Sequence, residues 1–236
     1  MLVLAIDTAT MASSVALATE GRLEAELTVE TGNTHSETLL AHIEQILLMA
    51  GRTKKELDAV AVSIGPGSFT GLRIGLSTAK ALSYGLSIPL VTVSTMEALA
   101  AHFPMEGARV GVLLDAQKKH AYAALYAHEH GELRPIIEPC VAVYQDFIAS
   151  LEEHAPVVLV GDLPQKKRAG LACPKGVSIA PPELIMPRAA TVARLGLADL
   201  RAGRTADAMM AEPLYIRRSE AEVLWEERHK SRTNPS

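Results

Sequence analysis

Residues 61–75 read AVSIGPGSFTGLRIG, and the interpretation of the whole chain starts from this stretch. The apolar, β-branched run from Val60 to Ile64 predicts a buried strand. Gly65-Pro66-Gly67 ends that strand, because glycine reaches positive φ without strain and proline fixes its own φ. A strand followed by a tight glycine turn is therefore expected here.

A helix is expected after the turn, capped by Ser68 or Thr70 and running to about Leu86, where Ser87-Ile88-Pro89 ends it. A strand, a glycine turn and a helix N-terminus together favour anion binding, because free amides and the helix dipole point outward. No Gly-Lys-Ser/Thr follows, and the glycine spacing misses the dinucleotide fingerprint by one residue. Two interpretations stand: a phosphate site, or a tight turn without a ligand.

Composition limits the class of protein. The chain has 236 residues, of which 48% are hydrophobic and 4% aromatic, so an aliphatic core is expected. The net charge of −4 argues against a protein that grips nucleic acid by itself. Cys140 and Cys173 form no metal or redox spacing. Met1–Ile6 is too short for a signal peptide or a membrane span, so a soluble cytoplasmic protein is expected.

The first thirty residues predict strands over Leu2–Ile6, Ser14–Ala18 and Leu23–Val29, joined by turns. Asp7 follows the first strand and precedes Thr and Ser hydroxyls, a pattern that could hold a hydrated cation beside phosphates. The vestigial nucleotide site predicted from these patterns comprises Asp7, Gly65, Gly67 and Ser68. The alternative is that Asp7 only builds the hairpin turn, where aspartate is common.

A helix is expected from Thr34 to Ala50, with the capping-box pair Thr34 and Glu37 at its start and Gly51 after its end. The helical period assigns a core stripe to Leu39, Leu40, Ile43, Ile46, Leu47 and Ala50. Leu48 and Met49 fall outside this stripe. His35 and His42 lie about 10 Å apart along the helix, too far to share one metal ion.

The helix after the glycine turn has a similar excess of apolar surface. Ile74, Ser77, Thr78, Ala81 and Tyr84 lie opposite its core face and are mostly small or apolar, which lets another helix approach closely. The two helices together predict a four-helix contact with a partner. The predicted partner-binding residues are His35, Leu39, Ile43, Leu48, Met49, Ile74, Ser77, Thr78, Ala81 and Tyr84. The alternative is that the second lobe of the same chain covers both helices.

The second half repeats the opening pattern. A strand over Leu90–Val93 and a helix over Met96–His102 lead to a boundary at Phe103–Gly107. A strand, a turn with Asp115 and a returning strand follow, so Asp7 and Asp115 occupy like positions in duplicated lobes. We expect lobes over 1–103 and 104–216 and a charged tail over 217–236. The last helix, 189–202, is expected to pack back on the first lobe.

The motifs resemble one family. Ile6-Asp7-Thr8-Ala9-Thr10, Thr34-His35-Ser36-Glu37, residues 65–75 and Leu114-Asp115-Ala116 with Tyr122–Tyr126 occur in the order and spacing of the TsaB (YeaZ) family. The resemblance implies an α/β fold of two lobes, the actin-like ATPase (ASKHA) fold, with mixed sheets flanked by helices. It also implies a subunit of the machinery that makes N6-threonylcarbamoyladenosine in the anticodon loop of tRNAs. The implied partners are a catalytic TsaD-like subunit and a TsaE-like ATPase, or a second copy when alone; tRNA is expected only through the complex.

The resemblance further implies that this chain is not itself a catalyst. The catalytic relative carries two metal-binding histidines where this chain has Thr95 and Leu99. The turn Asp115-Ala116-Gln117-Lys118 lacks the paired glycines that wrap phosphate in ATP-using members of the fold. We therefore expect no cofactor, no metal and no catalytic residue. The alternatives are a nucleotide-using enzyme and a peptidase, although no Ser-His-Asp or two-histidine zinc pattern is visible.

Overall fold

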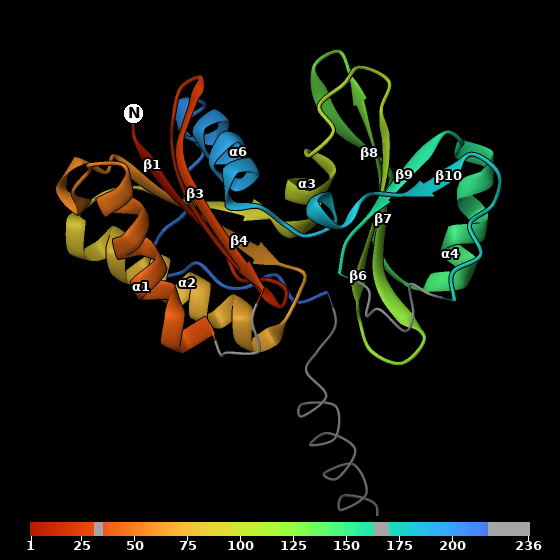
Figure 1. Ribbon diagram of the computed structural model, residues 1–236, viewed down its shortest axis with the longest axis horizontal. Helices are drawn as coiled ribbons and strands as arrows, with labels where there is room; N and C mark the ends of the chain where they lie inside the picture. Colours follow the sequence, from red (N-terminus) through yellow and green to blue (C-terminus); the bar gives the residue numbers. More distant parts are fainter. Residues whose placement is uncertain (31–34, 163–169, 217–236) are drawn as a thin grey trace, which may run out of the picture.

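The computed structural model describes residues 1–30, 35–162 and 170–216, and the side chains of residues 35–37 also fall outside that description. Within these ranges the chain forms two five-stranded sheets that stand side by side, with helices around them (Figure 1). The predicted capping pair Thr34 and Glu37, and the predicted tail over 217–236, lie outside the described residues.

The first sheet has the strand order β3-β2-β1-β4-β5. Its strands are β1 (Val3–Asp7), β2 (Ala12–Thr19), β3 (Arg22–Glu30), β4 (Ala59–Gly65) and β5 (Leu90–Ser94). β1 pairs with β2 in antiparallel register and with β4 in parallel register, so that Val3 stands opposite Ala18 on one side and Ala59 on the other. The sheet is therefore mixed, as the sequence predicts.

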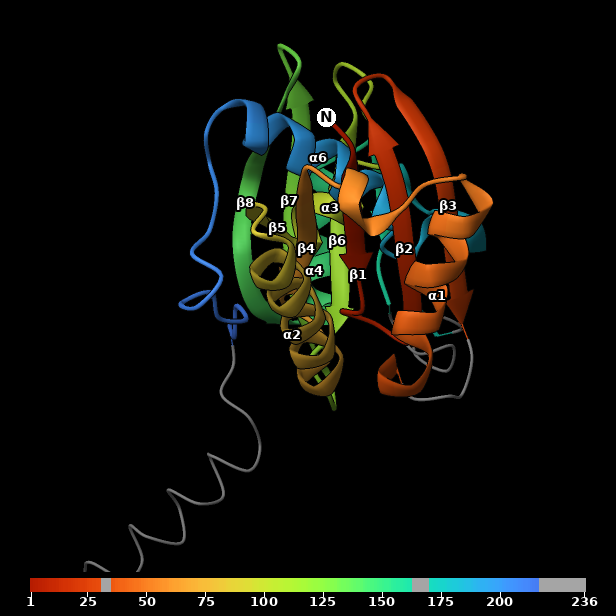
Figure 2. The ribbon, with the colours of Figure 1, turned by 90° about the vertical axis from the view of Figure 1, so that its left-hand side faces the viewer.

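Helices cover both faces of this sheet, and the alternation of β1 side chains explains how. Leu2, Leu4 and Ile6 pack with α1 (His35–Met49) and α2 (Phe69–Leu86) on one face. Val3 and Ala5 pack with α6 (Ala189–Arg201) on the other face. Successive side chains of a strand point to opposite faces, so a continuously apolar strand needs a layer on each side. Figure 2 shows α1 and α2 together on the side away from the second sheet.

The second sheet has the order β10-β9-β6-β7-β8. Its strands are β6 (Arg109–Asp115), β7 (His120–Glu129), β8 (Glu132–Val143), β9 (Val157–Val160) and β10 (Val177–Ile179). β6 pairs with β7 in antiparallel register and with β9 in parallel register, which repeats the pairing of β1 with β2 and β4. This duplicated arrangement is the actin-like ATPase fold predicted from the sequence.

The shorter helices lie around the two sheets. α3 (Thr95–Ala100) follows β5 and leads into the connection between the sheets, and η1 (Lys54–Glu56) precedes β4. α4 (Tyr144–Ser150) and η2 (Leu151–His154) lie between β8 and β9, and η3 (Pro182–Leu184) follows β10. No helix in the described ranges is both long enough and apolar enough to cross a membrane.

Leu40 and β8 differ from what the sequence predicts. Leu40, predicted in the core stripe of the first helix, is 60% exposed, because it lies at the edge of the stripe, about 100° around the helix from buried Leu39. β8 was not predicted, because Pro135 and Pro139 interrupt it. Proline is tolerated there since β8 is an edge strand, where an amide missing on the solvent side costs no ladder hydrogen bond.

Candidate functional site

The glycine turn between β4 and α2 is fixed by contacts with the first β-turn of the chain. Ser68 is the N-cap of α2, and its Oγ accepts a hydrogen bond from the Gly71 amide at 3.3 Å. Of the two predicted caps, Ser68 is therefore confirmed. The Ser68 amide donates to the carbonyl of Ala9 at 2.7 Å, and Thr8 Oγ1 donates to the carbonyl of Gly71 at 2.7 Å.

Glycine is required in this turn because other atoms fill the space that a side chain would need. A Cβ at Gly67 would meet the Ala9 carbonyl oxygen at 2.3 Å, and one at Gly75 would meet Thr8 Oγ1 at the same distance. Gly65 has a φ of +123°, and a Cβ there would meet the Leu214 carbonyl oxygen at 2.6 Å. These contacts give each glycine a packing role that needs no ligand.

The predicted nucleotide residues lie together around this turn. Asp7 is buried at the end of β1, and its Oδ1 accepts a hydrogen bond from the Ala9 amide at 3.1 Å. The Gly65 amide donates to Thr95 Oγ1 at 3.1 Å. The amides of Gly65, Ser68 and Gly71 thus donate within the chain, an arrangement that favours the tight-turn interpretation. Nucleotide binding by Asp7, Gly65, Gly67 and Ser68 stays a prediction.

Asp115 repeats the geometry of Asp7 in the second sheet. Its Oδ1 accepts a hydrogen bond from the Gln117 amide at 3.1 Å, at the end of β6. Thr95 and Leu99, at the positions where the resemblance implies metal-binding histidines in the catalytic relative, are both fully buried. Leu99 packs in an apolar cluster with Val110 and Val112. In the described part of the chain, no group of three or more His, Cys, Asp or Glu side chains is placed to hold a metal ion.

The outward side of α1 and α2 carries large apolar side chains that none of the described segments covers. Leu48 is 81% exposed, Met49 67% and Tyr84 75%. The two helices contact each other and the strands of the first sheet, and the second sheet does not cover this side. We call this surface the α1–α2 outer face; its exposed members are Leu40, Leu48, Met49, Ser77, Ala81, Tyr84 and Gly85. The alternative in which the second lobe covers both helices is wrong.

A ridge of small residues runs along the exposed side of α2. Ser77, Ala81 and Gly85 are spaced by four residues and therefore lie above one another on the helix. All three are exposed, and apart from its chain neighbours and its own helix backbone, no described residue has an atom within 4 Å of the place that a Gly85 Cβ would occupy. Half-buried Ile74 packs against the core cluster that includes α1 residues. The ridge has the geometry that allows a second helix to approach closely.

The other flank of α2 is covered by a segment that the sequence analysis missed, residues 206–215, here called the strap. Lys80 Nζ donates to the carbonyls of Met209 at 3.0 Å and Ala211 at 3.1 Å. The Tyr215 ring stacks on Phe69, with a centroid distance of 5.0 Å, and its hydroxyl accepts from Arg73 Nε at 3.0 Å. The strap has no helical or strand periodicity, so the apolar content of residues 206–215 was the only available signal.

Comparison with known proteins decides the family. The family model described as TsaD, tRNA N6-adenosine threonylcarbamoyltransferase, matches residues 29–225. The tRNA threonylcarbamoyladenosine biosynthesis protein TsaB of Bacillus subtilis is 30% identical over 98% of this chain and 100% of its own length. The protein of the same name from Escherichia coli is 31% identical over 95% of this chain and 97% of its own length. The chain belongs to the TsaB family.

A solved structure agrees with this assignment to the TsaB family. YeaZ from Pseudomonas aeruginosa is 28% identical, with a TM-score of 0.77, over 91% of this chain and 99% of its own. A second P. aeruginosa structure, described as an uncharacterized protein with similarity to peptidase YeaZ, has the same identity and TM-score. The family and the fold expected from the motifs are therefore confirmed.

Several residues of the predicted partner-binding set need correction. Leu39 and Ile43 are only 1% and 4% exposed, because they face the sheet within the core, so they cannot offer surface to a partner. The side chain of His35 lies outside the described residues. Leu40, not in the predicted set, is on the outer face instead. Ile74 and Thr78 are half-buried, whereas Ser77, Ala81 and Tyr84 are exposed.

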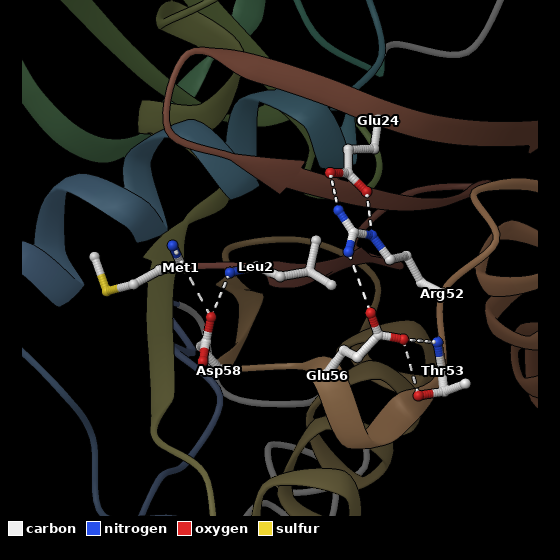
Figure 3. Close-up of polar contacts among 7 residues, drawn as sticks. All are labelled: Met1, Leu2, Glu24, Arg52, Thr53, Glu56 and Asp58. Atoms are coloured by element: carbon white, nitrogen blue, oxygen red, sulfur yellow. Dashed lines mark hydrogen bonds and ion pairs between the residues drawn. The ribbon is translucent and has the colours of Figure 1, made fainter.

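The C-terminal end of α1 is anchored by a polar network (Figure 3). Arg52 donates from Nε and Nη2 to the two carboxylate oxygens of Glu24 at 2.9 and 2.8 Å, and from Nη1 to Glu56 at 3.1 Å. This two-point contact with β3 lowers the pKa of the Glu24 carboxyl. The backbone and side chain of Thr53 both donate to Glu56, and these hydrogen bonds lower the pKa of that carboxyl as well. The network ties the segment that follows α1 to β3 and to η1.

Proposed function

We propose that this chain is a non-catalytic docking subunit in the biosynthesis of N6-threonylcarbamoyladenosine in tRNA. It binds a TsaD-like catalytic subunit through the α1–α2 outer face and acts with a TsaE-like ATPase. The observation that carries the proposal is the apolar outer face, which is exposed in the described part of the chain, in a member of a family whose relatives are named for this biosynthesis.

The chemistry of the outer face fits a helix pair as the partner. Burying a large apolar side chain contributes about 1.5–3 kcal/mol, so Leu48, Met49 and Tyr84 together supply a substantial part of a protein–protein affinity. The ridge of Ser77, Ala81 and Gly85 lets the partner backbone come near enough for these side chains to be covered. A second copy of the chain offers the same surface, so a homodimer is expected when the catalytic partner is absent.

The non-catalytic role is supported by the residues around the glycine turn. At the two positions where the catalytic relative has metal-binding histidines, the Thr95 hydroxyl accepts a hydrogen bond from the Gly65 amide, and Leu99 is an apolar core residue. The net charge of −4 disfavours binding of tRNA by the chain alone, so contact with tRNA is expected through the complex.

The test places one charge on the ridge. Ala81→Arg puts a guanidinium where the partner helix must pack, and co-purification with the TsaD-like subunit of the same organism is expected to be lost. Ala198→Arg is the matched control, because Ala198 is also an exposed helical alanine but lies on α6, on the opposite face of the first sheet. Thermal unfolding of both variants alone is expected to stay within about 2 °C of the parent, since exposed surface substitutions change stability by less than about 0.5 kcal/mol.

Retained binding by Ala81→Arg, or equal loss in both variants, would contradict the proposed interface. The nucleotide-using alternative is tested separately by calorimetry with ATP and Mg²⁺ on the isolated chain. Micromolar binding there would favour that alternative over a purely structural glycine turn.

A further inference from the structure

The strap has two sides of different character. Its small apolar residues Ala206, Ala208 and Ala211 are partly buried and pack against the core cluster to which α2 and β4 contribute. Met209 and Met210 face solvent instead and are 72% and 75% exposed. The alanines fasten the segment to the core, so within the described part of the chain the two large methionine side chains are not needed for packing. Exposed apolar side chains that lie together commonly mark an interaction surface.

The turn that carries Met209 and Met210, here called the methionine turn, is held by hydrogen bonds to its backbone. Asp207 Oδ1 accepts from the Met209 amide at 2.7 Å and from the Met210 amide at 3.3 Å. The Asp207 carbonyl accepts from the Ala211 amide at 2.8 Å. From the side of α2, Lys80 Nζ donates to the carbonyls of Met209 and Ala211. The backbone of the turn is therefore ordered while its methionine side chains stay exposed, and a partner that covers them does not have to order the turn.

The methionine turn is continuous with the α1–α2 outer face. Lys80 lies one helical turn before Tyr84, an exposed member of that face, so the turn that Lys80 holds lies close to Tyr84. Figure 2 shows the strap and α1 on opposite flanks of α2. At the other end of the strap, the stacked rings of Tyr215 and Phe69 are partly exposed, and the Arg73 guanidinium lies 3.8 Å from the centre of the Phe69 ring. Apolar and aromatic side chains thus accompany α2 for roughly 22 Å, at 1.5 Å per residue from Phe69 to Tyr84.

The size of a stable interface favours an extension of the outer face in this direction. Interfaces of standard size bury about 800 Å² on each partner and involve roughly 20–30 residues a side. The α1–α2 outer face has seven exposed members, which are too few for such an interface. The other exposed residues of α1 include polar Glu44 and Gln45, whereas the strap offers Met209 and Met210. The centres of interfaces are enriched in methionine and aromatic residues and depleted of charged ones, so the strap fits the extension better.

We propose that the methionine turn and the Phe69–Tyr215 stack belong to the docking surface, and that the TsaD-like catalytic subunit covers them together with the α1–α2 outer face. This inference rests on the proposed function and adds to it a contact region outside α1. The catalytic subunit is the expected occupant because the methionine turn borders the face that this subunit covers in the proposed function. Methionine is unbranched and polarizable, so Met209 and Met210 adapt to the shape of the surface that they meet.

Methyl NMR on the full chain tests the contact directly. The chain is labelled with ¹³C at its methionine methyl groups and titrated with the TsaD-like subunit of the same organism. The signals of Met209 and Met210 are expected to shift saturably, in step with the signal of Met49, which reports on the outer face. Met105 is the internal control, because it is 60% exposed but lies in the connection between the two sheets, and its signal is expected to stay in place.

The affinity of the complex is measured with matched variants. The double change Met209→Ala and Met210→Ala is expected to weaken binding of the catalytic subunit by about tenfold or more, since two large apolar contacts are lost. Met105→Ala removes an equally exposed methionine and is expected to bind like the parent. Both variants alone are expected to unfold at the temperature of the parent, because the changed side chains lie on the surface.

The outcomes separate this inference from the proposed function. A shift of Met49 without shifts of Met209 and Met210, or a double variant that binds as tightly as the parent, would overturn the extension and leave the proposed function intact. Failure of the parent to bind the catalytic subunit would overturn both. Shifts of Met209 and Met210 that follow only the concentration of the chain itself would assign the strap to a second copy and overturn the proposed occupant.

Discussion

A methyl group added at Gly75 or at Gly85 tests the interpretation of the deciding stretch as a packing motif. Both glycines lie within α2, so the change from glycine to alanine raises helix propensity at each by up to about 1 kcal/mol. Their surroundings differ completely. A Cβ at Gly75 would lie 2.3 Å from Thr8 Oγ1, whereas nothing lies within 4 Å of one at Gly85.

The free energies of unfolding are expected to change in opposite directions. At Gly75, overpacking costs about 1–3 kcal/mol and displacing Thr8 from the Gly71 carbonyl costs about 1 kcal/mol more, against the propensity gain of about 1 kcal/mol. The net destabilisation is about 2 kcal/mol, which lowers Tm by about 4–8 °C for a chain of this size. Gly85→Ala is expected to stabilise by roughly 0.5–1 kcal/mol.

Urea unfolding followed by circular dichroism measures both variants, and the m value should stay at that of the parent. Thr8→Ala removes the atom that the new methyl group would meet. Combined with Gly75→Ala it should therefore cost less than the sum of the two single changes. A Gly75→Ala variant as stable as the parent, or strictly additive effects in the double variant, would refute the reasoning.

Two further changes test the contacts that hold the segment after α1 and the strap beside α2. Arg52→Gln removes the group that lowers the pKa of Glu24. In the parent, this pair stabilises the fold fully above the ordinary glutamate pKa of about 4.3, and the stabilisation is lost as the pH falls through the lower pKa of Glu24 in the folded state. Acid unfolding of the variant should therefore depend less on pH in this window, and an unchanged pH profile would refute the role given to the pair. Lys80→Met removes the side chain that donates hydrogen bonds to two carbonyls of the strap. Amide hydrogen exchange over residues 206–215 should therefore become faster, while the amides of α6 stay protected. Unchanged exchange in residues 206–215 would show that Lys80 does not hold the strap.

Local pattern predicted the elements that contain one clear period. The apolar run of the first strand, the turn at Gly65-Pro66-Gly67 and the helix to Leu86 are all found, because each is fixed by nearby residues. The motifs also predicted the family. The duplication of Asp7 and Asp115 followed from the repeated order of strand, turn and strand, and the register of the two sheets confirms it.

The parts that depend on distant contacts could not be predicted. Leu40 sits at the edge of a helical stripe, and only the packed position of α1 decides that it faces solvent. The strap holds α2 through carbonyl groups, which every residue type possesses, so no side-chain pattern marks it. A shallow hollow between β3 and the start of α6, lined by Leu23, His102 and Arg194 among others, joins residues that no sequence spacing relates.

α6 has a consequence for synthesis of the chain. Val3, Ala5, Ala61 and Val91 pack in one cluster with Ala189, Val192, Ala193 and Leu197 of α6, and Gly196 lets α6 come so close that a Cβ there would lie 2.6 Å from the Cβ of Ala61. A nascent chain that has left the ribosome only as far as α3 therefore exposes to water the apolar face of its first sheet that α6 later covers. Completion of that sheet is a late event in translation, and until then chaperones have a surface to hold.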